Sequence, residues 1–175
     1  MNLYLIGYRG SGKSTVAQRL SDRLQLVAVD TDALVEKLAG TSISEIFASQ
    51  GEASFRKLES QVLRSLPTNA DQIISLGGGA PLAPSNRDWL KKTGKTIWLM
   101  APATILWERI RGDQQTSSRR PDLTNQGGLA EVQQVLAART PVYADCADYT
   151  IDVSRLSPEQ IVEKISDWWN SVDRD

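Results

Sequence analysis

The stretch "YLIGYRGSGKST", from Tyr4 to Thr15, decides the fold of this chain. A short apolar run, which we expect to be a buried strand, ends at Gly7, and a helical pattern begins near Lys13. Between them lies the spacing Gly7-x-x-x-x-Gly12-Lys13-Ser14, which is typical of a loop that holds phosphate groups. The strand before the loop and the helix after it are the context that this pattern requires.

Each residue type in this loop suits a phosphate chain. Glycines let backbone N–H groups converge on phosphate oxygens, and the start of a helix adds partial positive charge. The Lys13 ammonium can reach the terminal phosphates, and the Ser14 hydroxyl can supply an oxygen to Mg²⁺. The alternative is a glycine-rich turn that binds nothing. We expect a nucleotide to bind at Gly10, Ser11, Gly12, Lys13, Ser14 and Thr15.

The rest of the chain alternates between strand and helix patterns. Apolar runs that end at Asp30, Gly77, Met100 and Val153 predict four further strands. Strands that alternate with helices favour a parallel sheet covered on both faces, and no repeat or linker divides residues 1–175. The expected helices are 13–24, 43–47, 55–66, 85–92, 104–111, 129–139 (ending before Pro141) and 157–169, the last with Ser157 as its N-cap.

The composition narrows the class of protein. A chain of 175 residues suits one domain, and a net charge of −1 disfavours nucleic acid or anionic lipid as a partner. No histidine is present, so any proton transfer must use other side chains. No apolar run is long enough for a membrane span, and no signal peptide is expected. The single cysteine, Cys146, is expected to be a small buried residue in a reducing, cytoplasmic setting.

Two carboxylates, Asp30 and Asp32, follow the second expected strand. One interpretation is capping of the next helix, although one cap does not need two carboxylates. In the other, Asp30 would hold the Mg²⁺ shell through water, and Asp32 would orient a substrate hydroxyl and could take its proton. The strands that end at Gly77 and Met100 lack the usual terminal aspartate, and no Asn-Lys-x-Asp segment is present, which disfavours nucleotide switches and motors.

Three further features have a structural and a functional interpretation. Arg56 could simply pair with Glu52 or Glu59 at helical spacing, and Arg139 could simply suit a helix end. The glycines from Gly77 to Gly79 could be a flexible turn. They also permit close approach of a ligand at the edge of the sheet where open α/β folds bind ligands. Taken singly, these features do not separate the two interpretations.

Taken together, the motifs resemble shikimate kinase. The runs "GYRGSGKST", "DTD", "FRKLE", "GGG" and "RTPVY", with an Arg-Pro pair at Arg120-Pro121, occur in the order and spacing of that family, from Leu3 to about Ile165. The phosphate loop alone is generic, whereas "DTD", "FRxxE" and "GGG" in combination are specific. The resemblance implies an α/β fold of three layers, α/β/α, with a five-stranded parallel sheet of the nucleoside monophosphate kinase type. It also implies a mobile lid at about 112–128 and substrate-binding helices at about 32–62.

The resemblance also implies an activity. ATP, with Mg²⁺, would phosphorylate the 3-hydroxyl of shikimate, giving shikimate 3-phosphate and ADP on the route to chorismate and the aromatic amino acids; we expect a monomer. Asp32 would hold ring hydroxyls, and Arg56 and Arg139 would bind the carboxylate. By position, the implied sets are Asp32, Arg56, Gly77, Gly78, Gly79 and Arg139 for substrate, Lys13, Asp32 and Arg120 for catalysis, Arg111, Arg120 and Arg155 for ATP, and Ser14 and Asp30 (through water) for metal.

The polar segment from Gly112 to Gly128 departs from the family pattern. Its length is typical of a binding loop or lid, although a disordered surface loop would have the same sequence pattern. The family commonly has apolar residues after Arg-Pro, but here the sequence is "RRPDLT". Asp122 adds a negative charge, and Arg119 duplicates Arg120, so either arginine could be the phosphate contact.

Two other functions share the phosphate loop. Another small-metabolite kinase, such as a gluconate kinase, would need a different acceptor site. A non-catalytic nucleotide-binding switch or regulatory module would not need Lys13, Ser14, Asp32 and two substrate arginines together.

Overall fold

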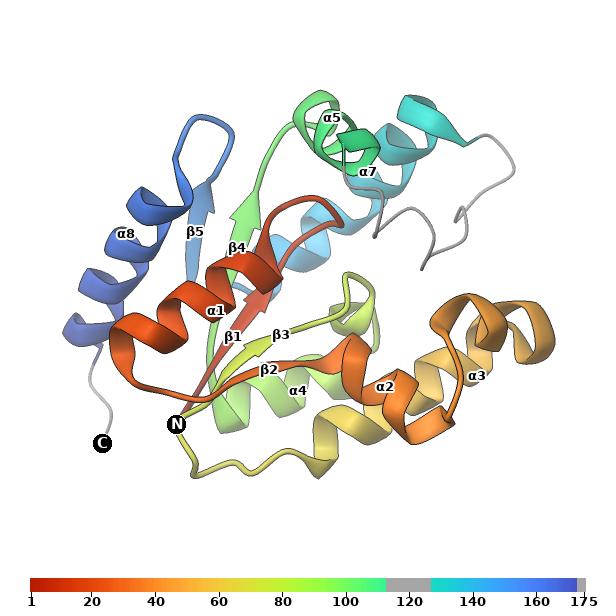
Figure 1. The fold of residues 1–175 in the computed structure, drawn as a ribbon, viewed down its shortest axis with the longest axis horizontal. Helices are drawn as coiled ribbons and strands as arrows, with labels where there is room; N and C mark the ends of the chain where they lie inside the picture. Colours follow the sequence, from red (N-terminus) through yellow and green to blue (C-terminus); the bar gives the residue numbers. More distant parts are fainter. Residues whose placement is uncertain (113–126, 173–175) are drawn as a thin grey trace.

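Parallel strands form the centre of the fold (Figure 1). The structure is a computed structural model, and it describes residues 1–112 and 127–172. The sheet has five strands in the order β2-β3-β1-β4-β5, and every neighbouring pair is parallel. The strands are β1 (Asn2–Ile6), β2 (Ala28–Asp30), β3 (Ile73–Ser75), β4 (Gly94–Met100) and β5 (Tyr149–Asp152). This sheet confirms the predicted fold class.

Helices cover both faces of the sheet. In β1, Leu3 and Leu5 pack toward one helical layer, which includes α1, α5 and α8, and Tyr4 and Ile6 pack toward the other, formed by α4 and parts of α3 and α7. This alternation is the two-residue period of a strand buried on both faces. The helices are α1 (Lys13–Leu24), α2 (Thr31–Ala39), α3 (Ile43–Ser65), α4 (Pro84–Thr93), α5 (Ala103–Gly112), α7 (Gly128–Cys146) and α8 (Pro158–Ser171), with a short 3₁₀ turn η1 (Ala80–Leu82).

Helices α2 and α3 build a smaller apolar cluster beside the sheet (Figure 1). Its buried side chains include Val35, Ile46 and Val62. The two helical patterns expected at 43–47 and 55–66 are the two halves of α3, which continue into each other through Gly51 (φ 78°, ψ 169°). Glycine adopts this non-helical backbone conformation readily, so the helix can change direction there. Leu63, in its second half, packs in the core cluster that includes Tyr4 and Ile6 of the sheet.

The prediction that the helix near 129–139 ends before Pro141 is wrong. α7 continues through Pro141 to Cys146. Proline removes one backbone hydrogen bond from a helix, but the following turn buries Tyr143 and Cys146 against the sheet. Burial of these side chains therefore outweighs the local preference to stop. The buried position of Cys146 confirms the expectation made for it.

The final helix starts as predicted. Ser157 caps α8, and its hydroxyl accepts a hydrogen bond from the backbone N–H of Gln160, whose side chain accepts one from the N–H of Ser157. This reciprocal capping box fixes the start of the helix. Within residues 1–112 and 127–172, no helix is both long and apolar enough to span a membrane.

Candidate active site

Loops from adjacent strands meet at one edge of the sheet. Leu5 of β1 and Asp30 of β2 both lie in register with Ser75 of β3. Parallel strands that end in register deliver their following loops to the same place. The phosphate-binding loop, the Asp30-Thr31-Asp32 segment and the glycines from Gly77 to Gly79 are therefore neighbours.

The phosphate-binding loop has the backbone that the sequence predicts. Gly10 and Gly12 have φ values of 80° and 90°, in the left-handed region that glycine favours. The Lys13 side chain is 7% exposed, and its Nζ donates hydrogen bonds to the carbonyl oxygens of Gly7 at 2.8 Å and Tyr8 at 3.0 Å. The ammonium therefore lies over the loop that is expected to hold the phosphates.

Ser14 and Asp30 connect the loop to β2. The Ser14 hydroxyl donates a hydrogen bond to Asp30 Oδ2 at 2.7 Å. The other Asp30 oxygen accepts hydrogen bonds from the N–H groups of Asp32 at 3.0 Å and Ala33 at 3.3 Å, which caps α2. Capping is thus observed, and it uses one carboxylate oxygen only. The second oxygen lies beside the Ser14 hydroxyl, so capping does not exclude a metal-binding role.

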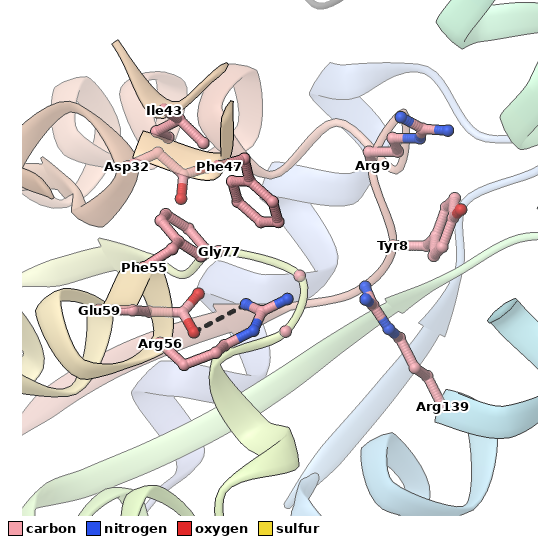
Figure 2. A pocket seen from close by; sticks show the side chains of 12 residues that line it. Tyr8, Arg9, Asp32, Ile43, Phe47, Phe55, Arg56, Glu59, Gly77 and Arg139 are labelled. Carbon is pink, nitrogen blue, oxygen red and sulfur yellow. Dashed lines mark hydrogen bonds and ion pairs between the residues drawn. The ribbon is translucent and has the colours of Figure 1, made fainter. Parts of the chain in front are cut away.

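A pocket opens between these loops and the α2–α3 cluster (Figure 2). Figure 2 shows Asp32, Phe47, Phe55 and Glu59 on one side, and Tyr8 and Arg139 facing them across the pocket. The lining residues are Tyr8, Arg9, Asp32, Ile43, Phe47, Phe55, Arg56, Glu59, Gly77, Gly78, Gly79 and Arg139. The structure therefore brings together every side chain and glycine that the resemblance assigned to the acceptor.

Arg56 is fixed by carboxylates of its own helix. Its Nη1 donates to Glu59 Oε2 at 2.9 Å, and its Nη2 donates to Glu52 Oε1 at 3.0 Å. Glu59 is only 2% exposed, and its burial raises the pKa of its carboxyl, against the lowering effect of the Arg56 guanidinium. The structural interpretation of Arg56, as a partner of Glu52 and Glu59 at helical spacing, is thus correct for these contacts. The same pairing orients the guanidinium along the pocket.

The glycines from Gly77 to Gly79 leave room for charged side chains. A Cβ atom on Gly77 would lie 2.7 Å from Asp32 Oδ1, and one on Gly79 would lie 2.5 Å from Arg56 Nη2. Both distances are shorter than van der Waals contact, so a side chain at either position would displace the charged group. Gly77 and Gly79 are therefore explained by the close approach of charged side chains.

Arg139 enters the pocket from α7. It is 8% exposed, and its guanidinium carbon lies 5.7 Å from the centre of the Tyr8 ring. One turn later, the Tyr143 hydroxyl donates a hydrogen bond to the carbonyl oxygen of Gly78 at 2.5 Å. Among residues 1–112 and 127–172, no carboxylate forms an ion pair with Arg139. Its charge is therefore available to an anionic ligand.

Comparison with known proteins agrees with this geometry. The family model described as shikimate kinase matches residues 9–170. The chain belongs to the shikimate kinase family. It is 42% identical over 164 residues to the shikimate kinase of Rhodopirellula baltica, covering 94% of this chain and 88% of that one. It is 41% identical over 165 residues to the shikimate kinase of Symbiobacterium thermophilum, covering 94% of each.

The fold agrees equally well with a solved member of the shikimate kinase family. The structure of the enzyme from Acinetobacter baumannii in complex with shikimate superposes with a TM-score of 0.88 at 30% identity. The match covers 98% of this chain and 95% of that one. The similarity therefore includes both the sheet and the helices that line the pocket.

The sequence did not identify every residue of the pocket of this shikimate kinase family member. Tyr8 and Arg9 lie between Gly7 and Gly12, at positions that the spacing of the phosphate-binding loop leaves unspecified. The sequence signal for them was an aromatic and a charged side chain among glycines. Phe55 is 5% exposed and lines the pocket, and the centre of its ring lies 4.9 Å from that of Phe47. Ile43, Phe47 and Glu59 complete the set that was missed.

Some predicted residues lie outside the pocket. Arg111, in the last turn of α5, and Arg155, after β5, are both exposed and do not line it. Their predicted contact with adenine remains a prediction. Arg119, Arg120 and Asp122, with most of the expected lid, lie outside the described residues.

Proposed function

We propose that this member of the shikimate kinase family transfers the γ-phosphate of ATP to the 3-hydroxyl of shikimate, giving shikimate 3-phosphate and ADP. The observation that carries the proposal is the convergence of Asp32, Arg56 and Arg139 in one pocket beside the phosphate-binding loop. A hydroxylated carboxylate needs both kinds of group, since a carboxylate can orient hydroxyls and arginines can bind the acid. The relative from Acinetobacter baumannii, whose structure contains shikimate, supports this choice of acceptor.

In the proposed reaction, Arg139 and Arg56 hold the acceptor carboxylate. Arg139 supplies the charge that no described carboxylate pairs with, and Arg56 contributes through its planar fork while Glu59 fixes its position. The apolar wall of Ile43, Phe47 and Phe55 suits the carbon ring and excludes water.

At the other end of the acceptor, Asp32 accepts hydrogen bonds from ring hydroxyls and turns the 3-hydroxyl oxygen toward the phosphates. As that oxygen forms its bond to phosphorus, its proton passes to Asp32, and the bond to the ADP oxygen breaks. Lys13 stabilises the charge that develops on the transferred group, because its ammonium is already placed over the loop. Positioning and charge stabilisation supply most of the rate in this class of reaction.

The donor set near the loop fits Mg²⁺. Within the part of the chain that the structure describes, no cluster of three or more His, Cys, Asp and Glu residues could hold a metal alone. Mg²⁺ in phosphoryl-transfer sites needs only one or two protein oxygens, since phosphates and water complete its shell. Ser14 Oγ and Asp30 Oδ2, 2.7 Å apart, would hold it directly and through water, respectively. When bound, the ion neutralises charge on the phosphates.

The remaining parts of the proposal concern the lid and the setting of the enzyme. The segment at 112–128 would cover the phosphates, with Arg120 or Arg119 as the contact, and Arg111 and Arg155 would lie near the adenine. Arg120 is the candidate to offset charge in the transition state, because arginine can hold phosphate bidentately.

We further propose that the enzyme acts as a monomer in the cytoplasm.

ADP release tests the proposed function. With Mg²⁺ and ATP present, we expect turnover that depends on added shikimate. Turnover with gluconate or another acceptor, but not with shikimate, would indicate a different small-metabolite kinase. Tight ATP binding without transfer to any acceptor would indicate a nucleotide-binding regulatory module. The position of phosphorylation on shikimate is read from the product by phosphorus–proton coupling in NMR.

A further inference from the structure

A buried ion pair joins the phosphate-binding loop to α7. Arg9 is 9% exposed, and its Nη2 donates a hydrogen bond to Glu131 Oε1 at 2.7 Å. Glu131 lies in the first turn of α7 and has no exposed surface. Removing water from two charges is costly, and leaving one of them alone is costlier still. The pair therefore holds the loop residue firmly against the start of the helix.

Tyr8, the loop residue before Arg9, contacts α7 farther along the helix, at Arg139. Arg139 follows Glu131 by about two helical turns, a spacing that places both on one stripe of α7. The Tyr8 ring, 1% exposed, lies 5.8 Å from the guanidinium carbon of Arg9 and 5.7 Å from that of Arg139. One aromatic ring thus contacts two guanidinium groups, an attraction of the cation–π kind.

The two arginines face different partners. Figure 2 shows Arg139 directed toward the Tyr8 ring and the pocket, and Arg9 with its guanidinium directed away from Asp32. Arg9 lines the pocket, but its hydrogen bond goes to Glu131, which is not a lining residue. The charge of Arg9 is therefore used within the protein, and that of Arg139 faces the acceptor.

We propose that Arg9 and Glu131 are positioning residues for acceptor binding. Their ion pair holds the phosphate-binding loop on α7, which places the Tyr8 ring against Arg139 and directs the Arg139 guanidinium to the acceptor carboxylate. In this proposal the Arg9 guanidinium bonds to Glu131 and not to the acceptor. This inference rests on the proposed function, because it takes the role of Arg139 from there.

The test compares Arg9→Met, Glu131→Gln and the double variant with the parent, using calorimetric binding of shikimate and steady-state kinetics. A mutation far from the reacting atoms that misplaces a binding group by about 1 Å can lower catalytic efficiency by about 10²-fold. We expect Arg9→Met to weaken shikimate binding by at least ~10-fold, within that range. The KM for shikimate should rise more than the KM for ATP, and kcat should change little.

Glu131→Gln should shift the same values less, because its amide oxygen still accepts a hydrogen bond from Arg9. The double variant should be no worse than Arg9→Met, since the two residues act as a unit.

Two controls separate positioning from a purely structural role. Ile165→Ala removes buried volume in α8, a helix that contributes no residue to the pocket lining, so we expect it to lower stability and leave shikimate binding unchanged. Arg9→Lys keeps the charge and should restore most of the affinity for shikimate. If Arg9→Met does not fold by circular dichroism, Glu131→Gln is judged by the same criteria.

Each outcome has a separate meaning. A parent protein that does not bind shikimate overturns the proposed function. A parent that binds shikimate, with Arg9→Met and Glu131→Gln binding equally well, overturns the positioning role alone. A larger rise in the KM for ATP than in the KM for shikimate also overturns it, because the pair would then serve the nucleotide.

Discussion

Ser14 and Asp30 share a hydrogen bond of 2.7 Å between the hydroxyl of the phosphate-binding loop and the carboxylate at the end of β2. Asp30 uses its second oxygen to cap α2. The Asp30 side chain therefore connects the expected metal site to α2, which carries Asp32 of the acceptor pocket. This double use explains why sequence alone could not choose between capping and metal binding for Asp30.

Asp30→Asn separates the two uses, because Asn caps a helix about as well as Asp but carries no charge. We expect stability close to that of the parent and shikimate-dependent turnover reduced by about 10–100-fold at limiting Mg²⁺. Asp30→Ala should lose turnover and also about 0.5–2 kcal/mol of unfolding free energy through the lost cap. Urea unfolding and ADP release measure the two effects. Normal Mg²⁺ dependence in Asp30→Asn would leave Asp30 as a cap only.

Lys13→Met tests the charge over the phosphates. The ammonium makes its observed hydrogen bonds within the loop, to Gly7 and Tyr8, so its loss should leave the fold intact. We expect kcat to fall by on the order of 10²-fold or more, since a preorganised charge at the transferred group is removed. Circular dichroism checks the fold and ADP release checks the rate. A near-normal kcat would refute the role of Lys13.

Arg139→Ala removes the charge that we assign to the acceptor carboxylate. The expected loss is roughly 2–4 kcal/mol of shikimate binding, or about 30- to 1,000-fold in KM. The KM for ATP should change little. Arg139→Lys should recover only part of the loss, because an ammonium lacks the planar fork. An unchanged KM for shikimate would remove Arg139 from the site.

Gly79→Ala tests the close approach of Arg56. The backbone of Gly79 (φ −101°, ψ −7°) accepts any residue, so the substitution introduces no backbone strain. The new methyl group would lie 2.5 Å from Arg56 Nη2, and the flexible guanidinium must move. We expect kcat/KM for shikimate to fall by roughly 10²-fold with little change in Tm.

The companion experiment places Gly79→Ala in an Arg56→Ala background. If displacement of Arg56 is the cause, the glycine substitution adds little there, because the group it displaces is already gone. Equal losses of kcat/KM in both backgrounds would point to another effect of the methyl group.

Glu59 gives a prediction about pH. Burial raises the pKa of its carboxyl in the folded protein above the ordinary value of about 4.3, although Arg56 opposes the shift. The folded state therefore holds this proton more tightly than the unfolded state, so its contribution to stability is greatest below that ordinary value and is lost as the pH rises through the folded pKa. Urea unfolding of the parent and Glu59→Gln from about pH 4 to 7 measures this. The free energy of unfolding of the parent relative to Glu59→Gln should fall as the pH rises, and a constant difference would contradict the shift.

Local sequence was sufficient where local physics decides structure. The start of α1 at Lys13, the cap of α8 at Ser157 and the alternation of strands and helices followed from glycine geometry, capping and periodicity. The motifs also predicted Asp32, Arg56, Gly77 to Gly79 and Arg139 as one acceptor set, and these residues line one pocket.

The tertiary structure decided what depends on contacts between distant segments. α7 passes Pro141 because Tyr143 and Cys146 are buried against the sheet, which no local pattern reports. Phe55 belongs both to the core and to the pocket wall, because it packs in the α2–α3 cluster and that cluster borders the pocket. The Arg9–Glu131 pair joins residues far apart in the chain. Sequence by itself determined the fold class and most of the elements, and it predicted the acceptor residues that line the pocket. Packing alone determined which buried partners hold its side chains, because burial and ion pairing depend on the whole fold.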